Sequence, residues 1–160
     1  VEIPYEAPYA MDIVHKHIPE ITLYLGLVNK PHFTPAVGAF KTGMRVEVPL
    51  HKSIMSSQAT VQSIWTSLYE RYASEKFVNV TPLSEVSAYD DWESTYDPRE
   101  CNDTNMMNIS VVANPLGHVL MIVQQDNLGK GASGAAIQNM NLMLGLPEQN
   151  GLPISNRDFC

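Results

Sequence analysis

Cysteine, positive charge and long apolar runs are all scarce in this 160-residue sequence. Its two cysteines, Cys101 and Cys160, are too few and too far apart to form a disulfide framework or a zinc site, so no metal is expected. Ten Lys and Arg stand against 17 Asp and Glu, and the net charge of −7 disfavours nucleic acids and anionic membranes as partners. Because no run of about 18 apolar residues occurs, no spanning helix is expected. These absences favour a cytoplasmic protein.

What is present suits one globular domain. The hydrophobic share of 44% is enough for one compact core in a chain of this length. Only 17% of the residues are charged, below the roughly 25% of soluble domains, which favours a surface partly covered in an assembly. The sequence begins at Val1 rather than at a methionine. From this we expect residues 1–160 to be a single domain of a longer polypeptide.

Apolar periodicity predicts helices and strands in an α+β order. The first predicted helix covers residues 18–26. The second begins after a cap at Ser56 or Ser57 and carries a buried stripe of 3.6-residue period over residues 61–72. The third covers residues 132–144 and is closed by Gly145 and Pro147. The predicted strands, rich in β-branched residues, cover residues 44–50, 77–80, 107–113 and 118–124. The last two are joined by a turn and form a hairpin. The expected fold is an open mixed, mainly antiparallel sheet with helices packed on one face.

Some of these elements carry more specific expectations. Strand 44–50 alternates apolar and polar residues, so one of its faces is expected to be packed and the other wet. Pro49 places the end of that strand, or the edge of the sheet, near it. Ser56 or Ser57 is the expected cap of the second helix. Residues 84–103 are acidic, aromatic and aperiodic, which predicts a long surface excursion.

Two imidazoles, an ammonium group and a carboxylate occur together in residues 15–20, at the expected start of a helix. The ordinary pKa of histidine lies near neutrality, which suits proton transfer at a reacting oxygen or sulfur. Glu20 follows His17 by three residues, so one helical turn brings its carboxylate toward that imidazole. From spacing alone, the favoured interpretation is a solvated polar helix start, or two histidines with packing roles.

Glycines recur in residues 126–131, just before the third predicted helix. A glycine loop ahead of a helix lets the backbone approach a ligand and presents unpaired N–H groups. Its spacing matches neither a Walker loop nor the dinucleotide fingerprint. The small residues that follow are also typical of a helix that packs closely on a neighbour, and both roles can hold together. Cys101 has no basic neighbour in the sequence, which favours a passive thiol.

Four segments stand in a specific order along the chain. They are residues 15–21 (HKHIPEI), 33–35 (FTP), 126–132 (DNLGKGA) and 138–143 (QNMNLM). Together they resemble the C-terminal half of N-acetyl-gamma-glutamyl-phosphate reductase, a relative of aspartate-semialdehyde dehydrogenase. The resemblance implies a glyceraldehyde-3-phosphate dehydrogenase-like C-terminal domain, which binds substrate and dimerises without the N-terminal dinucleotide-binding domain.

Members of that family reduce N-acetylglutamyl 5-phosphate with NADPH in arginine biosynthesis, through a thioester on a cysteine of the N-terminal half. The resemblance implies that His17 is the general acid/base and that Glu20 orients it, while His15 and Lys16 line the same pocket. It also places four loop residues toward the nicotinamide of NADP. These four are Asn127, Gly129, Lys130 and Gly131.

For the cation that holds the substrate carboxylate, the resemblance implies two candidates. Many relatives carry an arginine where Thr42 stands here, so Lys41 and Arg45 are the candidates. The expected partners are the acyl phosphate substrate and further copies of the chain, as a dimer or tetramer. Two alternatives remain, an aspartate-semialdehyde dehydrogenase domain and a dimerisation module without chemistry. The isolated chain is expected to be inactive under the main interpretation.

Overall fold

The computed structural model describes residues 6–83 and 96–154. The chain divides into two compact units, Val1–Lys41 and Thr42–Cys160, each of which is described by itself. The three helices are α1 (His17–Tyr24), α2 (Val61–Tyr72) and α3 (Gly134–Met143). None of the helices in the described residues is long and apolar enough to cross a membrane.

The first unit is built from a short two-stranded ribbon and α1. In the ribbon, β1 (Ala7–Pro8) pairs antiparallel with β2 (Ala36–Val37). The sequence pattern did not predict either strand, because each is only two residues long. The predicted helix over 18–26 is confirmed, although it begins one residue earlier and ends sooner. Gly26 follows it with a φ of 60°, a conformation that glycine adopts without steric cost.

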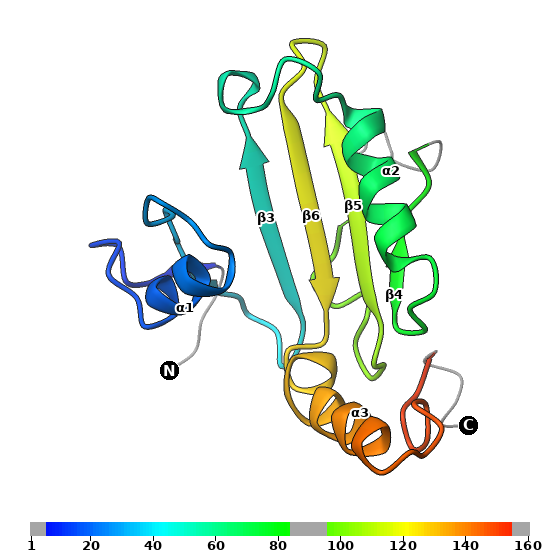
Figure 1. Cartoon of the computed structure of the whole chain (residues 1–160). Coiled ribbons are helices and arrows are strands. Elements are labelled where there is room, and N and C mark those ends of the chain that lie inside the picture. Colours follow the sequence, from blue (N-terminus) through cyan, green and yellow to red (C-terminus); the bar gives the residue numbers. More distant parts are fainter. Residues whose placement is uncertain (1–5, 84–95, 155–160) are drawn as a thin grey trace. The chain divides into compact units, whose positions relative to one another are not determined.

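The second unit is a four-stranded open sheet with the strand order β3-β6-β5-β4 (Figure 1). Its strands are β3 (Met44–Leu50), β4 (Val78–Val80), β5 (Met107–Ala113) and β6 (Val119–Gln125). β6 pairs antiparallel with both β3 and β5, whereas β4 runs parallel to β5. The predicted α+β fold, the mainly antiparallel mixed sheet and the β5–β6 hairpin are therefore confirmed. Pro49 lies on the edge strand β3, as its chemistry predicted.

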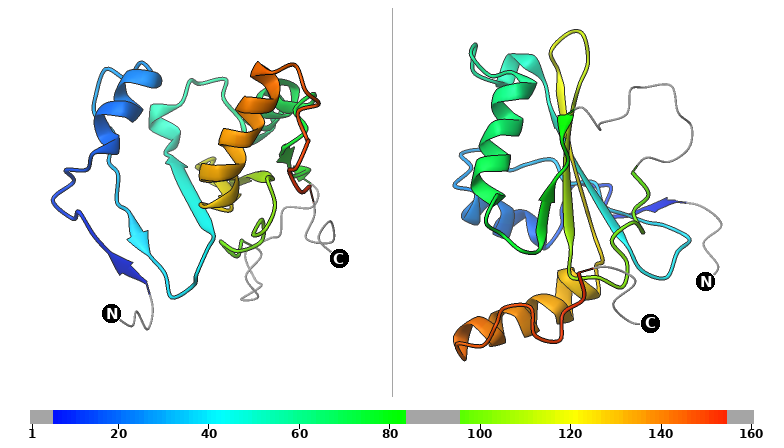
Figure 2. Two further views of the ribbon diagram at one scale, coloured as in Figure 1. Left: turned by 90° about the horizontal axis from the view of Figure 1, so that it is seen from below. Right: turned by 90° about the vertical axis from the view of Figure 1, so that its right-hand side faces the viewer.

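One face of this sheet is covered by α2, which packs over β4 and β5 (Figure 2). The predicted serine caps of this helix were wrong, because Thr60 directly precedes the first turn in an extended conformation. Thr60 Oγ1 accepts the Ser63 N–H at 3.1 Å, and Ser63 Oγ accepts the Thr60 N–H at 2.9 Å. This reciprocal pair satisfies two backbone donors that the helix leaves open. Ser56 instead belongs to a preceding turn, where its carbonyl accepts the Ala59 N–H.

The core of the second unit lies around the central strands. Its buried apolar side chains include Phe77, Ile109, Val111, Val119 and Ile122. The edge strand departs from the expectation of one packed face, because α2 packs over β4 and β5 at the far edge of the sheet rather than over β3. Val46 and Val48 remain 39% and 37% exposed.

The rest of the unit follows the sheet closely. A short 3-10 helix, η1 (Lys52–Ile54), comes after β3. Of the predicted surface excursion, residues 84–95 lie outside the described part, and residues 96–103 form turns against the sheet. After β6, a π-helical turn, η3 (Gly129–Ser133), leads into α3 at one end of the sheet (Figure 1). The predicted helix over 132–144 is thus confirmed from Gly134 on, with a wider turn before it.

Candidate functional site

Both histidines of the 15–20 segment belong to an aromatic–histidine cluster, which consists of Tyr9, His15, His17 and Phe33. His15 lies at its centre, with ring-centroid distances of 5.7 Å to Tyr9, 4.7 Å to His17 and 5.0 Å to Phe33. His17 is 6.1 Å from Phe33. The β1–β2 ribbon explains the arrangement, because the Tyr9 N–H donates to the Pro35 carbonyl at 3.0 Å and holds the two ends of the unit together.

The two imidazoles of this cluster differ in their burial and in their hydrogen bonds. His15 is half-buried, and its Nδ1 accepts the His17 backbone N–H at 3.2 Å. A nitrogen that accepts carries no proton, so the neutral His15 ring holds its hydrogen on Nε2. The His17 side chain is exposed and makes no hydrogen bond to any other described residue. Of the two, His17 is therefore the ring free to exchange a proton with a bound molecule.

The other charged residues of this segment are exposed. Glu20 lies one turn from His17 as predicted, but no hydrogen bond or ion pair joins the two within the described residues. Lys16 precedes α1 at its N-cap position, also exposed. Lys41 ends the first unit and is exposed. The group in direct contact with His17 is thus His15, a relation that sequence spacing did not indicate.

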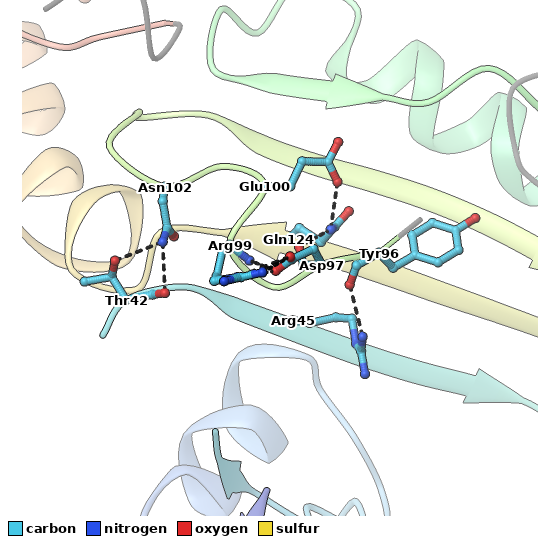
Figure 3. Close-up of polar contacts among 8 residues, drawn as sticks. All are labelled: Thr42, Arg45, Tyr96, Asp97, Arg99, Glu100, Asn102 and Gln124. Carbon is cyan, nitrogen blue, oxygen red and sulfur yellow. Dashed lines mark hydrogen bonds and ion pairs between the residues drawn. The ribbon is translucent and has the colours of Figure 1, made fainter. Parts of the chain in front are cut away.

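Arg45 lies in the second unit, on the sheet face opposite α2. Its Nε is 2.8 Å from Glu47 Oε1, and its guanidinium donates to the Tyr96 carbonyl at 3.0 Å (Figure 3). The neighbouring Gln124, the cross-strand partner of Arg45, donates to the Asp97 carbonyl at 2.6 Å and to Glu100 at 2.9 Å. Arg45 and Gln124 together hold residues 96–100 against the sheet.

A second guanidinium lies within residues 96–100, on Arg99, which the sequence analysis did not single out. Arg99 forms a two-pronged contact with Asp97, in which Nη2 approaches Oδ2 to 2.6 Å and Nε approaches Oδ1 to 2.9 Å (Figure 3). This contact lowers the pKa of Asp97 to about 2 and raises the pKa of Arg99. The Asp-Pro-Arg order, typical of a tight turn, was the sequence signal that could have indicated the pair.

The glycine loop of residues 126–131 is held from within by Asp126, which is only 5% exposed. Its Oδ1 accepts the N–H groups of Leu128 at 2.8 Å and Gly129 at 3.0 Å, while Oδ2 accepts the Asp103 N–H at 3.0 Å. Burial is the largest effect and raises the pKa of Asp126, but the three donors together bring it below its ordinary value. Asp126 is therefore an ionised anchor of the loop, and the sequence reasoning missed that role.

The glycines of this loop are explained by packing within the chain. A Cβ at Gly129 would lie 3.0 Å from the Thr104 carbonyl oxygen, and one at Gly131 would lie 3.1 Å from Gln125 Nε2. Glycine at these positions therefore needs no bound ligand to account for it.

The two polar side chains of the loop point to different partners. Lys130 donates to Gln138 Oε1 at 2.7 Å and lies 5.4 Å from the Phe77 ring centroid, and burial lowers the pKa of its ammonium group. A contact between Lys130 and a cofactor would require it to leave these partners. Asn127 uses its Oδ1 to accept the Gly43 N–H at 2.9 Å, which leaves its NH₂ group as a donor. An amide donor fixed in this way is available to an acceptor group of a bound molecule.

Cys101 and the acidic side chains offer little further chemistry in the described residues. Cys101 is 3% exposed, and burial raises the pKa of its thiol to about 11. A thiol with this pKa is protonated near neutrality, which agrees with the predicted passive role. Within the described residues, no three His, Cys, Asp or Glu side chains lie close enough together to hold a metal ion.

Comparison with known proteins finds similarity to reductases of the same name from several bacteria. The chain is 42% identical over 138 residues to the N-acetyl-gamma-glutamyl-phosphate reductase of Burkholderia lata, a match that covers 86% of this chain and 42% of the relative. It is 40% identical over 145 residues to N-acetyl-gamma-glutamyl-phosphate reductase 2 of Nostoc sp., covering 90% of this chain and 45% of the relative. The corresponding enzyme 2 of Pseudomonas putida is 37% identical over 144 residues, with 89% and 45% covered. The chain thus spans less than half the length of these relatives.

A family description matches the chain over most of its length as well. Residues 5–127 match the semialdehyde dehydrogenase dimerisation domain, a range that includes the aromatic–histidine cluster and the whole four-stranded sheet. It ends at Asn127, within the glycine loop. On this match, the chain belongs to the semialdehyde dehydrogenase dimerisation-domain family.

Proposed function

We propose that residues 1–160 form the substrate-binding and dimerisation domain of a cytoplasmic reductase that converts N-acetylglutamyl 5-phosphate to N-acetylglutamate 5-semialdehyde. The observation that carries this proposal is the identity of about 40% to reductases named for that substrate, over 86% or more of this chain. The exposed His17 in its aromatic surroundings supports it, because such a site can move a proton.

The proposed chemistry uses a cysteine outside this chain. Its thiolate displaces phosphate from the acyl phosphate and forms a thioester, which is then reduced and released as the aldehyde. NADPH supplies the hydride for the reduction when it is bound. His17 takes up the proton of the thiol as the thiolate forms and gives a proton to the oxygen of the reduced adduct. It takes that proton back when the adduct breaks down to the aldehyde and the thiolate. His15 holds the segment in place through its contact with the His17 N–H.

The remaining predicted site residues differ in how readily each could contact the substrate, the cofactor or His17. Lys16 and Lys41 are exposed cations and are available to the carboxylate of the substrate. Arg45 would bind it only by giving up its contacts with Glu47 and the Tyr96 carbonyl. Glu20 modulates His17 from one turn away, without direct contact. On the side of the cofactor, Asn127 donates through its NH₂ group, next to the backbone of Gly129, Lys130 and Gly131.

Self-association through the open sheet face is the second part of the proposal. A groove of about 470 Å³ lies between α2 and β6, with Ile64, Leu68 and Met121 among its lining residues. Val48, the cross-strand partner of Met121, extends the same apolar surface to the sheet edge. The family name of a dimerisation domain and this exposed apolar surface support a two-fold contact with a second copy.

Light scattering tests the assembly. The unaltered chain should give the mass of a dimer or tetramer, and Val48→Glu should shift it toward the monomer, because a carboxylate would be buried in the contact. Leu116→Glu is the matched control, since Leu116 is 75% exposed in the hairpin turn. A strict monomer at high concentration, or equal effects of the two variants, would contradict a contact through this face.

Turnover in the reverse direction tests the function. A reductase that contains this domain and its dinucleotide-binding half should reduce NADP in the presence of phosphate and N-acetylglutamate 5-semialdehyde. The 160-residue chain alone should show no turnover, because it lacks the nucleophile and most of the cofactor site. A preference for aspartate semialdehyde would replace the proposal with the aspartate-semialdehyde dehydrogenase alternative. No turnover with either aldehyde would favour a dimerisation module without chemistry.

A further inference from the structure

Two histidines of the second unit, His51 and His118, lie opposite each other at one end of the sheet. β3 ends there beside the start of β6, and the last registered pair of the two strands is Leu50 and Val119 (Figure 1). The next position on each side of that pair is a histidine. Their rings stack with a centroid distance of 4.1 Å and an interplanar angle of 28°. The antiparallel register therefore explains a contact between residues that are far apart in the sequence.

Each of the two rings accepts a backbone hydrogen bond from η1. His118 Nδ1 accepts the Lys52 N–H at 3.0 Å, and His51 Nδ1 accepts the Ser53 N–H at 3.2 Å. A ring nitrogen that accepts carries no proton, so each neutral ring holds its hydrogen on Nε2. The Ser53 hydroxyl, 2.7 Å from His51 Nδ1, then donates to that ring as well. We call His51, Lys52, Ser53 and His118 the histidine clasp, because they join η1 to the connection between β5 and β6.

The backbone at His118 is fixed by the turn that precedes it. Asn114 Oδ1 accepts the N–H groups of Leu116 and His118, each at 3.0 Å. The Asn114 N–H donates in turn to the His118 carbonyl at 3.1 Å. The His118 residue is half-buried, whereas His51 is exposed. His118 is therefore the member of the pair that exchanges its partner for water less easily.

The charged groups around the clasp give little support to a positive charge on it. β3, η1, the β5–β6 connection and β6 carry three charged side chains, on Arg45, Glu47 and Lys52. Arg45 and Glu47 pair with each other at 2.8 Å, and Glu47 lies roughly 13 Å from His51 along the strand, at 3.3 Å per residue. Lys52 directs its ammonium group to the Ala59 carbonyl at 2.9 Å. In this part of the described chain, no carboxylate is thus placed to neutralise a charged imidazole pair.

Protonation reverses the hydrogen bonding of the clasp. A protonated Nδ1 is a donor, so it would face the backbone N–H group that it binds in the neutral state. Two charged rings at a centroid distance of 4.1 Å would also repel each other. An open clasp therefore takes up protons more readily than a closed one, and a falling pH favours opening.

We propose that His51 and His118 form a pH-sensitive clasp, which holds η1 to the β5–β6 connection while both rings are neutral and releases it when they take up protons. Because histidine ordinarily titrates near pH 6.5, the release should occur between about pH 8 and pH 5.5.

The clasp adjoins the groove of the proposed self-association. Lys52 contacts the Ala59 carbonyl, and Ala59 and Ser56 both line that groove. Release of η1 would loosen this wall, so the assembly should weaken at low pH. This consequence rests on the proposed function, whereas the clasp itself concerns the chain alone.

Amide hydrogen exchange at Lys52, relative to an unstructured peptide at the same pH, tests the clasp directly. In the unaltered chain, protection of the Lys52 N–H should fall about fivefold from pH 8 to pH 5.5, as expected for loss of one hydrogen bond. In His118→Asn the fall should disappear, because an amide oxygen replaces Nδ1 as an acceptor that does not titrate. His32→Asn is the matched control and should keep the fall, since the exposed His32 lies outside the clasp. Protection independent of pH in the unaltered chain, or an equal fall in His118→Asn, would overturn the proposal.

Nitrogen-15 chemical shifts of the imidazoles give a test that needs no variant. At pH 8, both His51 and His118 should carry their hydrogen on Nε2 and show an unprotonated Nδ1. A hydrogen on Nδ1 of His118 would overturn the proposal even if His118→Asn failed to fold.

Light scattering at pH 8 and pH 5.5 tests the consequence for assembly. The unaltered chain should give a smaller mass at pH 5.5, and His118→Asn should give the same mass at both pH values. An unchanged mass in a chain whose Lys52 amide responds to pH would overturn the link to the groove. A monomer at both pH values would contradict the proposed self-association, while the exchange of Lys52 would still decide the clasp.

Discussion

Asp126→Asn is the substitution whose effect the structure defines best. The carboxylate accepts three backbone N–H groups, two on Oδ1 and one on Oδ2, in a site that is 5% exposed. In its best orientation, the amide keeps its oxygen toward Leu128 and Gly129 and turns its NH₂ group toward the Asp103 N–H. One charge-assisted bond is then lost, two are weakened, and a buried donor is left opposite another donor. We expect a loss of about 2–4 kcal/mol in the free energy of unfolding.

Urea unfolding at pH 7 measures this loss, with Asp97→Asn as the control. Asp97 also carries a lowered pKa, but its partner Arg99 is exposed, so its variant should lose no more than about 1 kcal/mol. Equal losses in the two variants would refute the reasoning, because burial of the acceptor would then make no difference.

The pH dependence of the same variant has a definite sign. The folded pKa of Asp126 lies below its ordinary value, so its stabilising effect is present above about pH 4 and is lost as the pH falls through the folded pKa. A protonated Asp126 resembles an asparagine. The difference in unfolding free energy between the unaltered chain and Asp126→Asn should therefore shrink between pH 7 and pH 3. A constant difference would mean that the charge of Asp126 does not stabilise the loop.

Three further predictions concern packing and burial. A variant with Cys101 as its single thiol should resist iodoacetamide at pH 8 until it is unfolded, because burial raises the pKa of Cys101 to about 11; rapid labelling of the folded chain would contradict this. Gly43→Ala should lower stability by about 1–3 kcal/mol in urea unfolding, since its φ of 123° is unfavourable for alanine, and an unchanged midpoint would count against this backbone conformation. Trp65→Phe should cost about 1–2 kcal/mol, because the Thr81 carbonyl loses the indole N–H at 2.8 Å; a neutral effect would show that this bond is dispensable.

The sequence predicted those parts of the fold that local patterns determine. The alternation in β3, the turn between β5 and β6 and the apolar stripe of α2 each depend on residues that are close in the chain. The exposure of Val46 and Val48 was not predictable in this way, because it depends on which strands α2 covers. The cap of α2 was missed because three candidate hydroxyl residues precede it, and only the backbone conformation selects Thr60.

In the candidate site, too, the sequence predicted local groupings of residues but not contacts that depend on the fold. The segment with His15, His17 and Glu20 was predicted, because its residues lie within one or two helical turns. The contact of His15 with the His17 N–H is local but leaves no pattern of residue types. The part of Tyr9 in the cluster depends on the β1–β2 ribbon, which is too short to leave a pattern. Two of the three donors to Asp126 lie two and three residues away, but the third, the Asp103 N–H, lies 23 positions away in the chain. Spacing along the sequence therefore indicated the candidate site residues but not the groups that hold them in place.

Steady-state kinetics of histidine variants, in the reductase that combines this domain with its dinucleotide-binding half, test the central claim most directly. His17→Asn should lower kcat by about 10²- to 10⁴-fold, the range of general acid/base assistance, with little change in thermal stability because its ring is exposed. His15→Asn should mainly raise KM, and Glu20→Gln should have the smallest effect, since Glu20 does not contact His17 in the described structure. Full turnover in His17→Asn, with turnover abolished in His15→Asn, would contradict the assignment of proton transfer to His17.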